Sequence, residues 1–228
     1  MGAAQVAHPW LRGGRGGVHD RRMSSDERLS GVPLKRGVRR QGRDNMPAPP
    51  TALDDCILDA WRISAGATVF LVQHLTDRLW ASALPGSPRR TVRRIVAHLH
   101  NARCSWMRSL AVGTGVAIPS RVDPALASRR DTVRALNSSS KAILKMLQAG
   151  LRNGGDLPGV SSAYIWGAWP RNVVLFTAYA LSHEAHHRGQ LLQMARELGQ
   201  RLPAEVVAGL WQWSSRLREA RRKRTPGG

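Results

Sequence analysis

The segment from Arg171 to Leu198 constrains the fold more than any other, because apolar residues and two histidines recur in it at steps of three and four. The side chains on this stripe are Phe176, Ala180, His183, His187, Leu191 and Met194. That spacing is typical of one face of an α-helix, and an apolar face of this length must be buried against other elements. A buried histidine pair also needs a polar group or an ion to meet.

Four further segments have helical spacing, so the sequence predicts five helices. Their approximate ranges are 51–75, 89–112, 124–151, 171–198 and 203–222. Thr51 is the expected N-cap of the first helix, and either Asp123 or, later in the chain, Ser128 caps the third. Two prolines and a glycine at 84–88 form a turn that no helix can cross. The fifth helix is expected to direct three apolar side chains toward the bundle: Leu210, Trp211 and Trp213.

The composition agrees with one helical domain. At 42% hydrophobic residues, a chain of 228 residues has enough apolar material for one well-filled core or at most two small ones. No uninterrupted apolar run approaches the roughly 18 to 20 residues of a membrane-spanning helix. We therefore expect a soluble, all-α domain over residues 51–222 and no membrane partner.

The strongly basic charge raises the question of whether the protein binds nucleic acid. The formal net charge is +20, and much of the excess lies in residues 1–45 and 216–224. Basic ends attract phosphate backbones without reading sequence, and no helix-turn-helix, zinc-finger spacing or RNA-binding strand accompanies them. We expect no specific nucleic-acid partner.

Residues 1–48 are predicted to be a disordered basic tail, because glycine and arginine are interleaved there without helical or strand periodicity. The Arg-Arg pairs of this tail are followed by polar or charged residues, so no export signal is visible. Met46 stands just before the first helical segment and is a candidate for the true start, which N-terminal mass spectrometry would test. Cys56 and Cys104 are expected to be buried thiols of a cytoplasmic protein.

The two histidines of the stripe are candidates for metal ligands. His183 and His187 are four residues apart, so their rings project from one helix face about one turn apart and can share an ion. His98 lies on the inward stripe of the second helix and can be the third ligand if the two helices pack together. Three imidazoles leave a position for water or a substrate atom, and they suit zinc, nickel, copper or iron about equally well.

The remaining histidines and Cys104 have simpler interpretations. His74 and His100 are read as surface or core histidines, and His100 points almost opposite to His98 because only two positions separate them. His186 lies at the edge of the stripe, where it either faces solvent or supports a ligand. Cys104 as a nucleophile beside the metal is the less favoured alternative, because it lies six positions after His98 on the same helix.

Two histidine segments resemble those of a known family. Residues 183–190, HEAHHRGQ, resemble the H-x-x-x-H-R-G-Q segment of the DinB-like superfamily, and residues 97–103 resemble its first histidine segment. The resemblance covers nearly all of residues 51–222, including the closing Leu-Trp-Gln-Trp helix. It implies a four-helix up-down-down-up bundle with an extra C-terminal helix. It also implies a divalent metal site, for zinc, nickel or a related ion, formed by His98, His183 and His187.

Some members of that family resemble thiol-dependent transferases or isomerases that use glutathione, mycothiol or bacillithiol. The resemblance thus implies a small-molecule substrate and a low-molecular-weight thiol. We hypothesise that the open metal position binds a thiol or water and lowers its pKa. Glu184 is a candidate general base, and the alternative is that it is a solvated charge on the helix surface. Arg188 is a candidate for holding an anionic group of a substrate or cofactor, and the alternative is a surface ion pair. Gly189 and Gln190 are expected to serve close helix approach and a cap-like hydrogen bond.

Residues 153–169 are predicted to form a long loop. Loops of this length inside compact domains often bind ligands. Tyr164 and Trp166, with Trp169, would give the loop an aromatic lining. We therefore take Tyr164 and Trp166 as candidate substrate-binding residues.

Two other classes of function stay open. Residues 183–187 match H-E-x-x-H, in which Glu184 would be the base of a zinc peptidase. The third histidine of one such class is missing, and no strand edge for holding a peptide is predicted. A non-enzymatic metal-binding stress protein is compatible with the basic ends. A homodimer is one option for the assembly.

Overall fold

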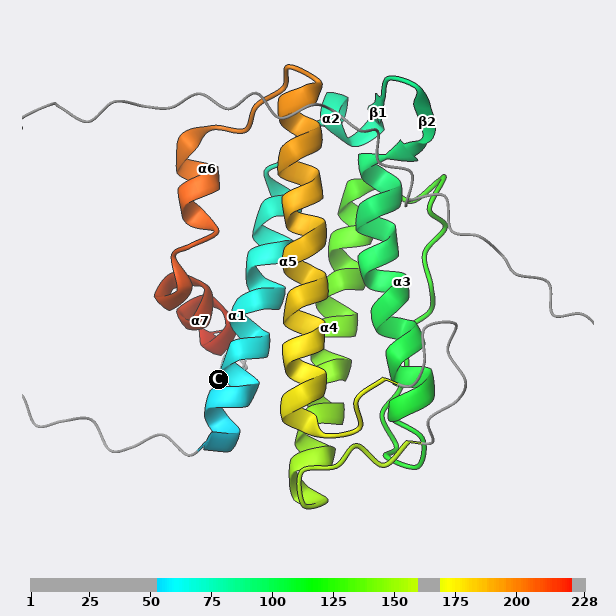
Figure 1. The fold of residues 1–228 in the computed structure, drawn as a ribbon, viewed down its shortest axis with the longest axis vertical. Helices are drawn as coiled ribbons and strands as arrows, with labels where there is room; N and C mark the ends of the chain where they lie inside the picture. Colours follow the sequence, from blue (N-terminus) through cyan, green and yellow to red (C-terminus); the bar gives the residue numbers. More distant parts are fainter. Residues whose placement is uncertain (1–52, 160–168, 223–228) are drawn as a thin grey trace, which may run out of the picture. The chain divides into compact units, whose positions relative to one another are not determined.

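Four long helices form a bundle in the computed structural model, which describes residues 53–159 and 169–222. The long helices are α1 (Leu53–Gln73), α3 (Val92–Leu110), α4 (Arg129–Arg152) and α5 (Val173–Glu197). In Figure 1, α1 and α5 run upward, whereas α3 and α4 run downward. The expected all-α bundle and its up-down-down-up order are therefore confirmed. The predicted tail 1–48 and the predicted cap Thr51 lie outside the described residues.

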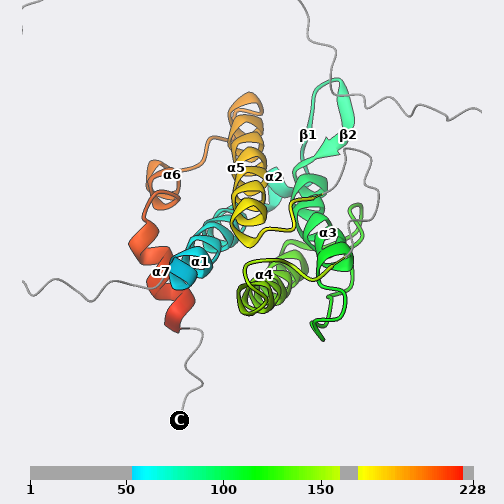
Figure 2. The ribbon, with the colours of Figure 1, turned by 60° about the horizontal axis from the view of Figure 1, so that its bottom comes forward.

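The helices pack as a square. α1 packs against α4 and α5, and α3 packs against the same two helices, so α1 and α3 lie at opposite corners (Figure 2). Because α3 and α5 are neighbours, side chains on their facing surfaces can meet. Among the described helices, none combines the length and the apolar character that a membrane-spanning segment requires.

Short elements connect and flank the bundle. Between α1 and α3 lie α2 (Asp77–Ala81) and an antiparallel pair of strands, β1 (Ala83–Leu84) and β2 (Ser87–Thr91). After α5 come α6 (Ala204–Gly209) and α7 (Trp213–Arg222). Figure 2 shows α6 and α7 on the outer side of α1, away from α3.

Several local expectations were wrong. The second helix begins at Val92 rather than Arg89, because the preceding residues pair as β2. The fifth helix is split into α6 and α7. Leu210 is buried as expected, but Trp211 and Trp213 are 77% and 56% exposed, because the break between the two helices turns them outward. Cys56 is exposed rather than buried, since it lies in the first turn of α1.

Side-chain caps decide where three of the long helices begin. Thr91, Ser128 and Asn172 accept hydrogen bonds from the first backbone N–H groups of α3, α4 and α5. Such caps satisfy donors that have no partner within the helix. Ser128 is therefore the cap of α4, and Asp123 is not. The Asp123 carboxylate instead accepts from Ala125 N in the preceding turn.

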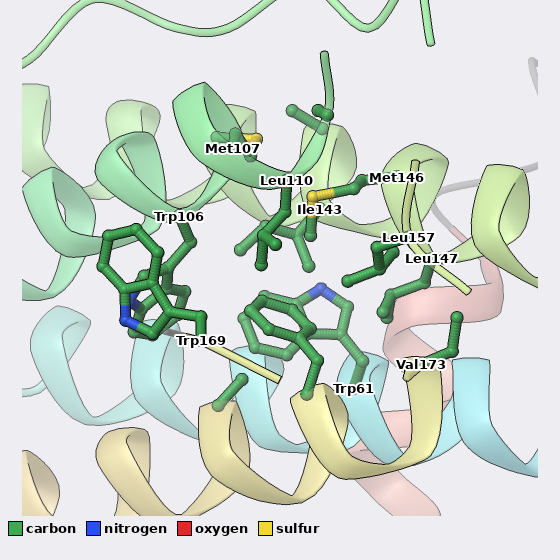
Figure 3. Packing of buried hydrophobic residues seen from close by; sticks show 14 of the residues in the cluster. Trp61, Trp106, Met107, Leu110, Ile143, Met146, Leu147, Leu157, Trp169 and Val173 are labelled. Atoms are coloured by element: carbon green, nitrogen blue, oxygen red, sulfur yellow. The ribbon is translucent and has the colours of Figure 1, made fainter. Parts of the chain in front are cut away.

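The core consists of two apolar clusters stacked along the bundle. One is centred on Trp61 and Trp106, and the other on Leu71 and Leu99. Figure 3 shows Trp61 among side chains of the first cluster, which α3, α4 and α5 contribute. Trp61 is fully buried, and its indole N–H donates to Ser140 O at 3.1 Å. Burial of such an aromatic residue stabilises the fold, and the hydrogen bond removes the cost of its polar end.

One close backbone contact fastens the 153–159 loop to the end of α3. A Cβ at Gly159 would lie 2.0 Å from Ser109 O and 2.4 Å from Leu110 Cα. Because backbone atoms cannot yield as a side chain does, we expect Gly159→Ala to lower the free energy of unfolding by about 1–3 kcal/mol. Urea denaturation measures the change. Gly189→Ala is the control, since a Cβ at that position meets nothing within 4 Å, and an equal loss in both variants would contradict the prediction.

Candidate metal centre

Three histidines from two helices converge on one point. His98 of α3 and His183 of α5 have their Nε2 atoms 3.3 Å apart, and the Nε2 atoms of His183 and His187 are 3.2 Å apart. The three ligand atoms all lie within 4.8 Å of one another. The structure thus brings together the three predicted metal ligands in a cluster that could hold an ion.

The hydrogen bonds of His187 fix which of its nitrogens faces the cluster. Its Nδ1 lies 2.8 Å from Gln190 Oε1, an atom that can only accept. The proton of the neutral ring therefore resides on Nδ1, and the Nε2 lone pair points toward His183 and His98. The Gln190 amide in turn lies 2.8 Å from Nε2 of His186, which is exposed. His186 thus contacts the residue that orients a ligand.

The environment keeps these rings neutral. Burial lowers the pKa of His183 to about 3, assisted by the neighbouring His187 and His98. Burial also lowers the pKa of His187 to about 4. The pKa of His98 is lowered by burial and then by the positive charge of Arg121. Neutral imidazoles keep the lone pair that a metal ion needs, so protons do not compete for it near pH 7.

An aromatic wall lies on the bundle side of the cluster. The Trp106 ring packs edge-on against the His183 ring with centroids 5.0 Å apart, and the Tyr179 ring lies 6.3 Å from it. Trp106 is buried, so this contact restricts the orientation of His183. The Nδ1 atom of His183 is buried and has no hydrogen-bond partner among residues 53–159 and 169–222.

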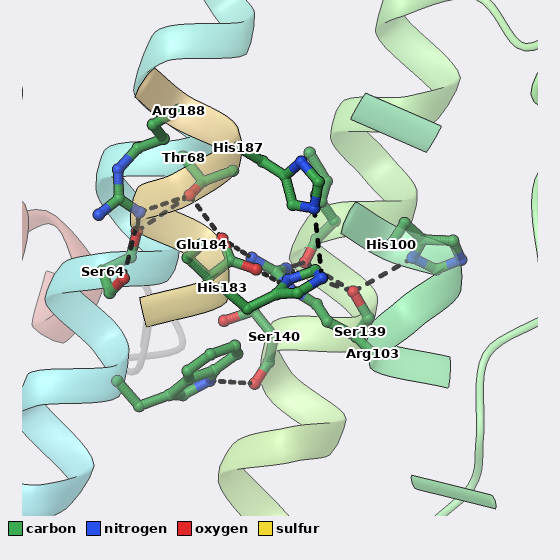
Figure 4. A network of polar contacts seen from close by, with 12 residues as sticks. Ser64, Thr68, His100, Arg103, Ser139, Ser140, His183, Glu184, His187 and Arg188 are labelled. Atoms are coloured by element: carbon green, nitrogen blue, oxygen red, sulfur yellow. Dashed lines mark hydrogen bonds and ion pairs between the residues drawn. The ribbon is translucent and has the colours of Figure 1, made fainter. Parts of the chain in front are cut away.

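Glu184 points away from the cluster into a buried ion pair (Figure 4). Arg103 Nε and Nη2 donate to its two oxygens at 2.9 and 2.8 Å, and Thr68 Oγ1 donates at 2.6 Å. Both side chains of the pair are 0% exposed. Burial alone would raise the pKa of Glu184, but the charge and hydrogen bonds of Arg103, with the bond from Thr68, hold it below its usual range.

Arg188 lies on a different side of α5 from the histidines. Its Nη1 donates to Thr68 Oγ1 at 2.9 Å and to the carbonyl and hydroxyl oxygens of Ser64, both at 3.2 Å. Figure 4 shows these bonds directed to α1, while His183 and His187 face α3. Burial lowers the pKa of Arg188; Glu184 opposes that shift and the charge of Arg103 adds to it.

The other residues considered at the sequence level lie as follows. His100 is buried, and its ring nitrogens lie 3.1 Å from Ser139 Oγ and 2.8 Å from Ser120 O. Cys104 is buried beside His100, and burial raises the pKa of its thiol. His74 is exposed, and its ring packs at a tilt against the ring of Phe70. Gly189 has no close neighbour that a Cβ would meet, so the expected close helix approach is wrong. Tyr164 and Trp166 lie outside the described residues.

Sequence reasoning missed two residues that support the site, Arg103 and Thr68, and expected of a third, Gln190, only a cap-like hydrogen bond. Arg103 pairs with Glu184, Thr68 bonds the same carboxylate, and Gln190 orients His187. A signal for Arg103 was present, because it stands four positions after Leu99 and three before Trp106 on the apolar stripe of α3. A charged residue on such a stripe needs a buried partner.

A comparison with family models gives an independent result. The model of the DinB family matches residues 50–216. The chain belongs to the DinB family. Neither the comparison with curated proteins nor that with solved structures finds a match. The matched region of this DinB family protein contains the four long helices and all three clustered histidines, so the family and the candidate metal centre occupy the same part of the chain.

Proposed function

We propose that this DinB family protein binds one divalent metal ion through Nε2 of His98, His183 and His187, and acts on a small molecule with a thiol or water as nucleophile. The convergence of the three nitrogens carries the proposal. In a tetrahedral site with metal–nitrogen distances of about 2.0–2.1 Å, ligand nitrogens lie about 3.3 Å apart. The distances from His183 Nε2 to the Nε2 atoms of His187 and His98, 3.2 and 3.3 Å, match that spacing. Zinc and nickel both suit three imidazoles.

A bound divalent ion would supply positive charge that lowers the pKa of a thiol or water at the open position. Neighbouring residues of the chain hold the ligand histidines in the orientation that metal binding requires. Gln190 keeps the proton of His187 on Nδ1, and Trp106 restricts the ring of His183. Glu184 is a positioning residue, because its pairing with Arg103 fixes the turn of α5 that carries His183.

Thiol-dependent S-transfer or isomerisation is the reaction class we favour, with hydrolysis as the variant in which water replaces the thiol. The peptidase alternative requires Glu184 to take a proton from water. Its carboxylate is fully buried, and both oxygens are already engaged by Arg103 and Thr68. That burial argues against a general base at this position.

Removal of one ligand should abolish metal binding. We expect about one metal ion per chain in untagged wild-type protein and nearly none in His183→Ala, because two imidazoles hold a divalent ion weakly. Elemental analysis of the purified proteins measures the content. His74→Ala is the matched control, since this exposed histidine follows α1 and contacts Phe70 rather than the cluster. Equal metal content in His183→Ala and wild type would overturn the proposed site.

An assay of the metal-loaded protein separates the classes of function. Consumption of glutathione, mycothiol or bacillithiol with an electrophile, if it persists in Glu184→Gln, supports transferase chemistry. Peptide cleavage that Glu184→Gln abolishes while the variant keeps its full metal content would support a peptidase. Full metal content without turnover of any of the three thiols or of a peptide would favour a non-enzymatic metal-binding protein.

A further inference from the structure

A cavity borders the face of α5 that lies opposite the histidines. It has a volume of about 350 Å³ and lies between α1, α5 and the α6–α7 connection. From α5 it is lined by Leu181, Ala185, Arg188, Gly189 and Leu192. Ala185 and Gly189 each stand two positions after a clustered histidine, so they project almost oppositely from the helix. A volume of this size is in the range of small-molecule sites.

Small residues and the attachment of α6 and α7 keep this cavity open. A Cβ at Gly189 would meet nothing within 4 Å. The helices α6 and α7 are both attached to α1 through contacts with Phe70. The Arg216 guanidinium lies 4.0 Å from the Phe70 ring centroid, and a Cβ at Gly209 would come within 2.6 Å of that ring. Since α6 and α7 are fixed to α1, the α6–α7 connection lies beside α5, and the cavity is the space between that connection and α5.

The cavity contains a cation whose charge is not balanced locally. The Nη1 atom of Arg188 bonds only neutral oxygens, those of Ser64 and Thr68. In the part of the chain that the structure describes, the hydrogen bonds of Arg188 are made by Nη1, and its Nε and Nη2 atoms are open to solvent. Glu184, the nearby carboxylate, is already engaged by Arg103 and Thr68. The group formed by Arg103, Glu184 and Arg188 therefore carries one net positive charge, which a bound anion would neutralise.

The rim of the cavity is aromatic and the lining is apolar. Trp211 and Trp213, which are 77% and 56% exposed, lie at the α6–α7 connection. They line the cavity together with Ile63 and Leu210. Besides Arg188, the lining carries three side chains with a polar group, Ser64 with its hydroxyl and the two tryptophans with one indole N–H each. The lining offers one cation, so it matches the single charge and two oxygens of a carboxylate, which a guanidinium fork can bind, better than the double charge of a phosphate group.

We propose that this cavity, here called the Arg188 pocket, binds a small organic carboxylate with an aromatic or branched apolar body. The carboxylate pairs with Nε and Nη2 of Arg188, and the apolar body lies over Gly189 against Trp211 and Trp213. The pocket is distinct from the metal centre. It is joined to it by the hydrogen bonds from Arg188 to Thr68 and from Thr68 to Glu184, which neighbours His183.

Calorimetric titration of the full chain with 4-phenylbutanoate and with 4-phenylbutanamide tests the proposal. Because a charge-assisted hydrogen bond is lost with the amide, we expect the acid to bind about tenfold or more tightly. The same titration on His183→Ala, which lacks the proposed metal, should give the same preference. Binding that requires His183 would place the carboxylate at the metal and overturn the Arg188 pocket without affecting the proposed function.

Two variants locate the binding. Gly189→Leu fills the cavity where open space exists, so it should fold normally and abolish binding of the acid. Arg188→Met should remove the preference for acid over amide, whereas Arg134→Met, at an exposed position of α4, should leave it unchanged. Thermal unfolding shows whether each variant is folded. If Arg188→Met does not fold, Gly189→Leu and the comparison of acid with amide still decide.

Three results would overturn the proposal. They are equal affinity for acid and amide, undiminished binding in Gly189→Leu, and absence of binding of either probe to the wild type. A subunit contact is the competing explanation of the exposed tryptophans. A wild-type dimer in sedimentation that Trp211→Ser converts to a monomer would assign the pocket to that contact and also overturn the proposal.

Discussion

Arg103→Met is expected to lower the free energy of unfolding by about 3–5 kcal/mol, because it leaves the carboxylate of Glu184 buried without its countercharge. Both groups are 0% exposed, and the two bonds between them are 2.9 and 2.8 Å long. Urea denaturation measures the loss. Glu184→Leu should destabilise by a similar amount, since Arg103 would then be the unpaired charge. In contrast, Arg134→Met removes an exposed ion pair with Asp131 and should cost less than about 1 kcal/mol.

The double variant Arg103→Met/Glu184→Leu provides the decisive comparison. Replacement of a whole buried ion pair by apolar side chains of similar volume is often neutral or stabilising. We therefore expect the double variant to recover most of the stability that either single variant loses. Losses that simply add in the double variant would mean that the pair is not energetically coupled, contrary to its geometry.

Periodicity was sufficient to predict the bundle because each long helix buries a continuous stripe. The α5 stripe placed His183 and His187 correctly, and His98 needed only that α3 and α5 be neighbours. The apolar stripe of one helix does not show which other helix packs against it. It came from the resemblance to the DinB-like superfamily, and the packing of α3 against α5 then agreed with it.

The local errors arose where tertiary contacts override local pattern. Arg89 and Arg90 lie in β2, because pairing with β1 closes the turn before Thr91 caps α3. The Leu-Trp-Gln-Trp stretch suggested a buried helix face, yet a break there exposes both tryptophans. Hydrophobicity alone cannot distinguish a core residue from the rim of a cavity.

The environments of Glu184 and Arg188 could not be predicted from their neighbours in sequence. Both flank metal-ligand candidates, so proximity along the chain suggested catalytic roles. On a helix, however, adjacent residues point in directions about 100° apart. Glu184 therefore meets Arg103 and Thr68, and Arg188 meets α1 at Ser64, away from the cluster.

Acid should destabilise the metal-free protein well before its carboxylates titrate. The pKa values of His183 and His187 in the folded state are about 3 and about 4, below the ordinary value of 6.5. The unfolded chain therefore takes up protons first as the pH falls. The free energy of unfolding is therefore unaffected by the titration of these two histidines above pH 6.5. It falls progressively toward pH 4, by at most about 1.4 kcal/mol per pH unit for each imidazole.

Urea denaturation between about pH 6.5 and pH 5 isolates this effect, because unfolded carboxylates titrate near pH 4. The variant His183→Gln/His187→Gln should show a shallower dependence, with the remainder due to His98 and His100, whose pKa values are also lowered. Zinc at about a thousandfold above its dissociation constant should add about 4 kcal/mol to the wild type near pH 7 and nothing to this variant. Since protons and the ion need the same lone pairs, a variant that kept both the wild-type pH dependence and the zinc stabilisation would show that His183 and His187 neither titrate as buried groups nor bind metal.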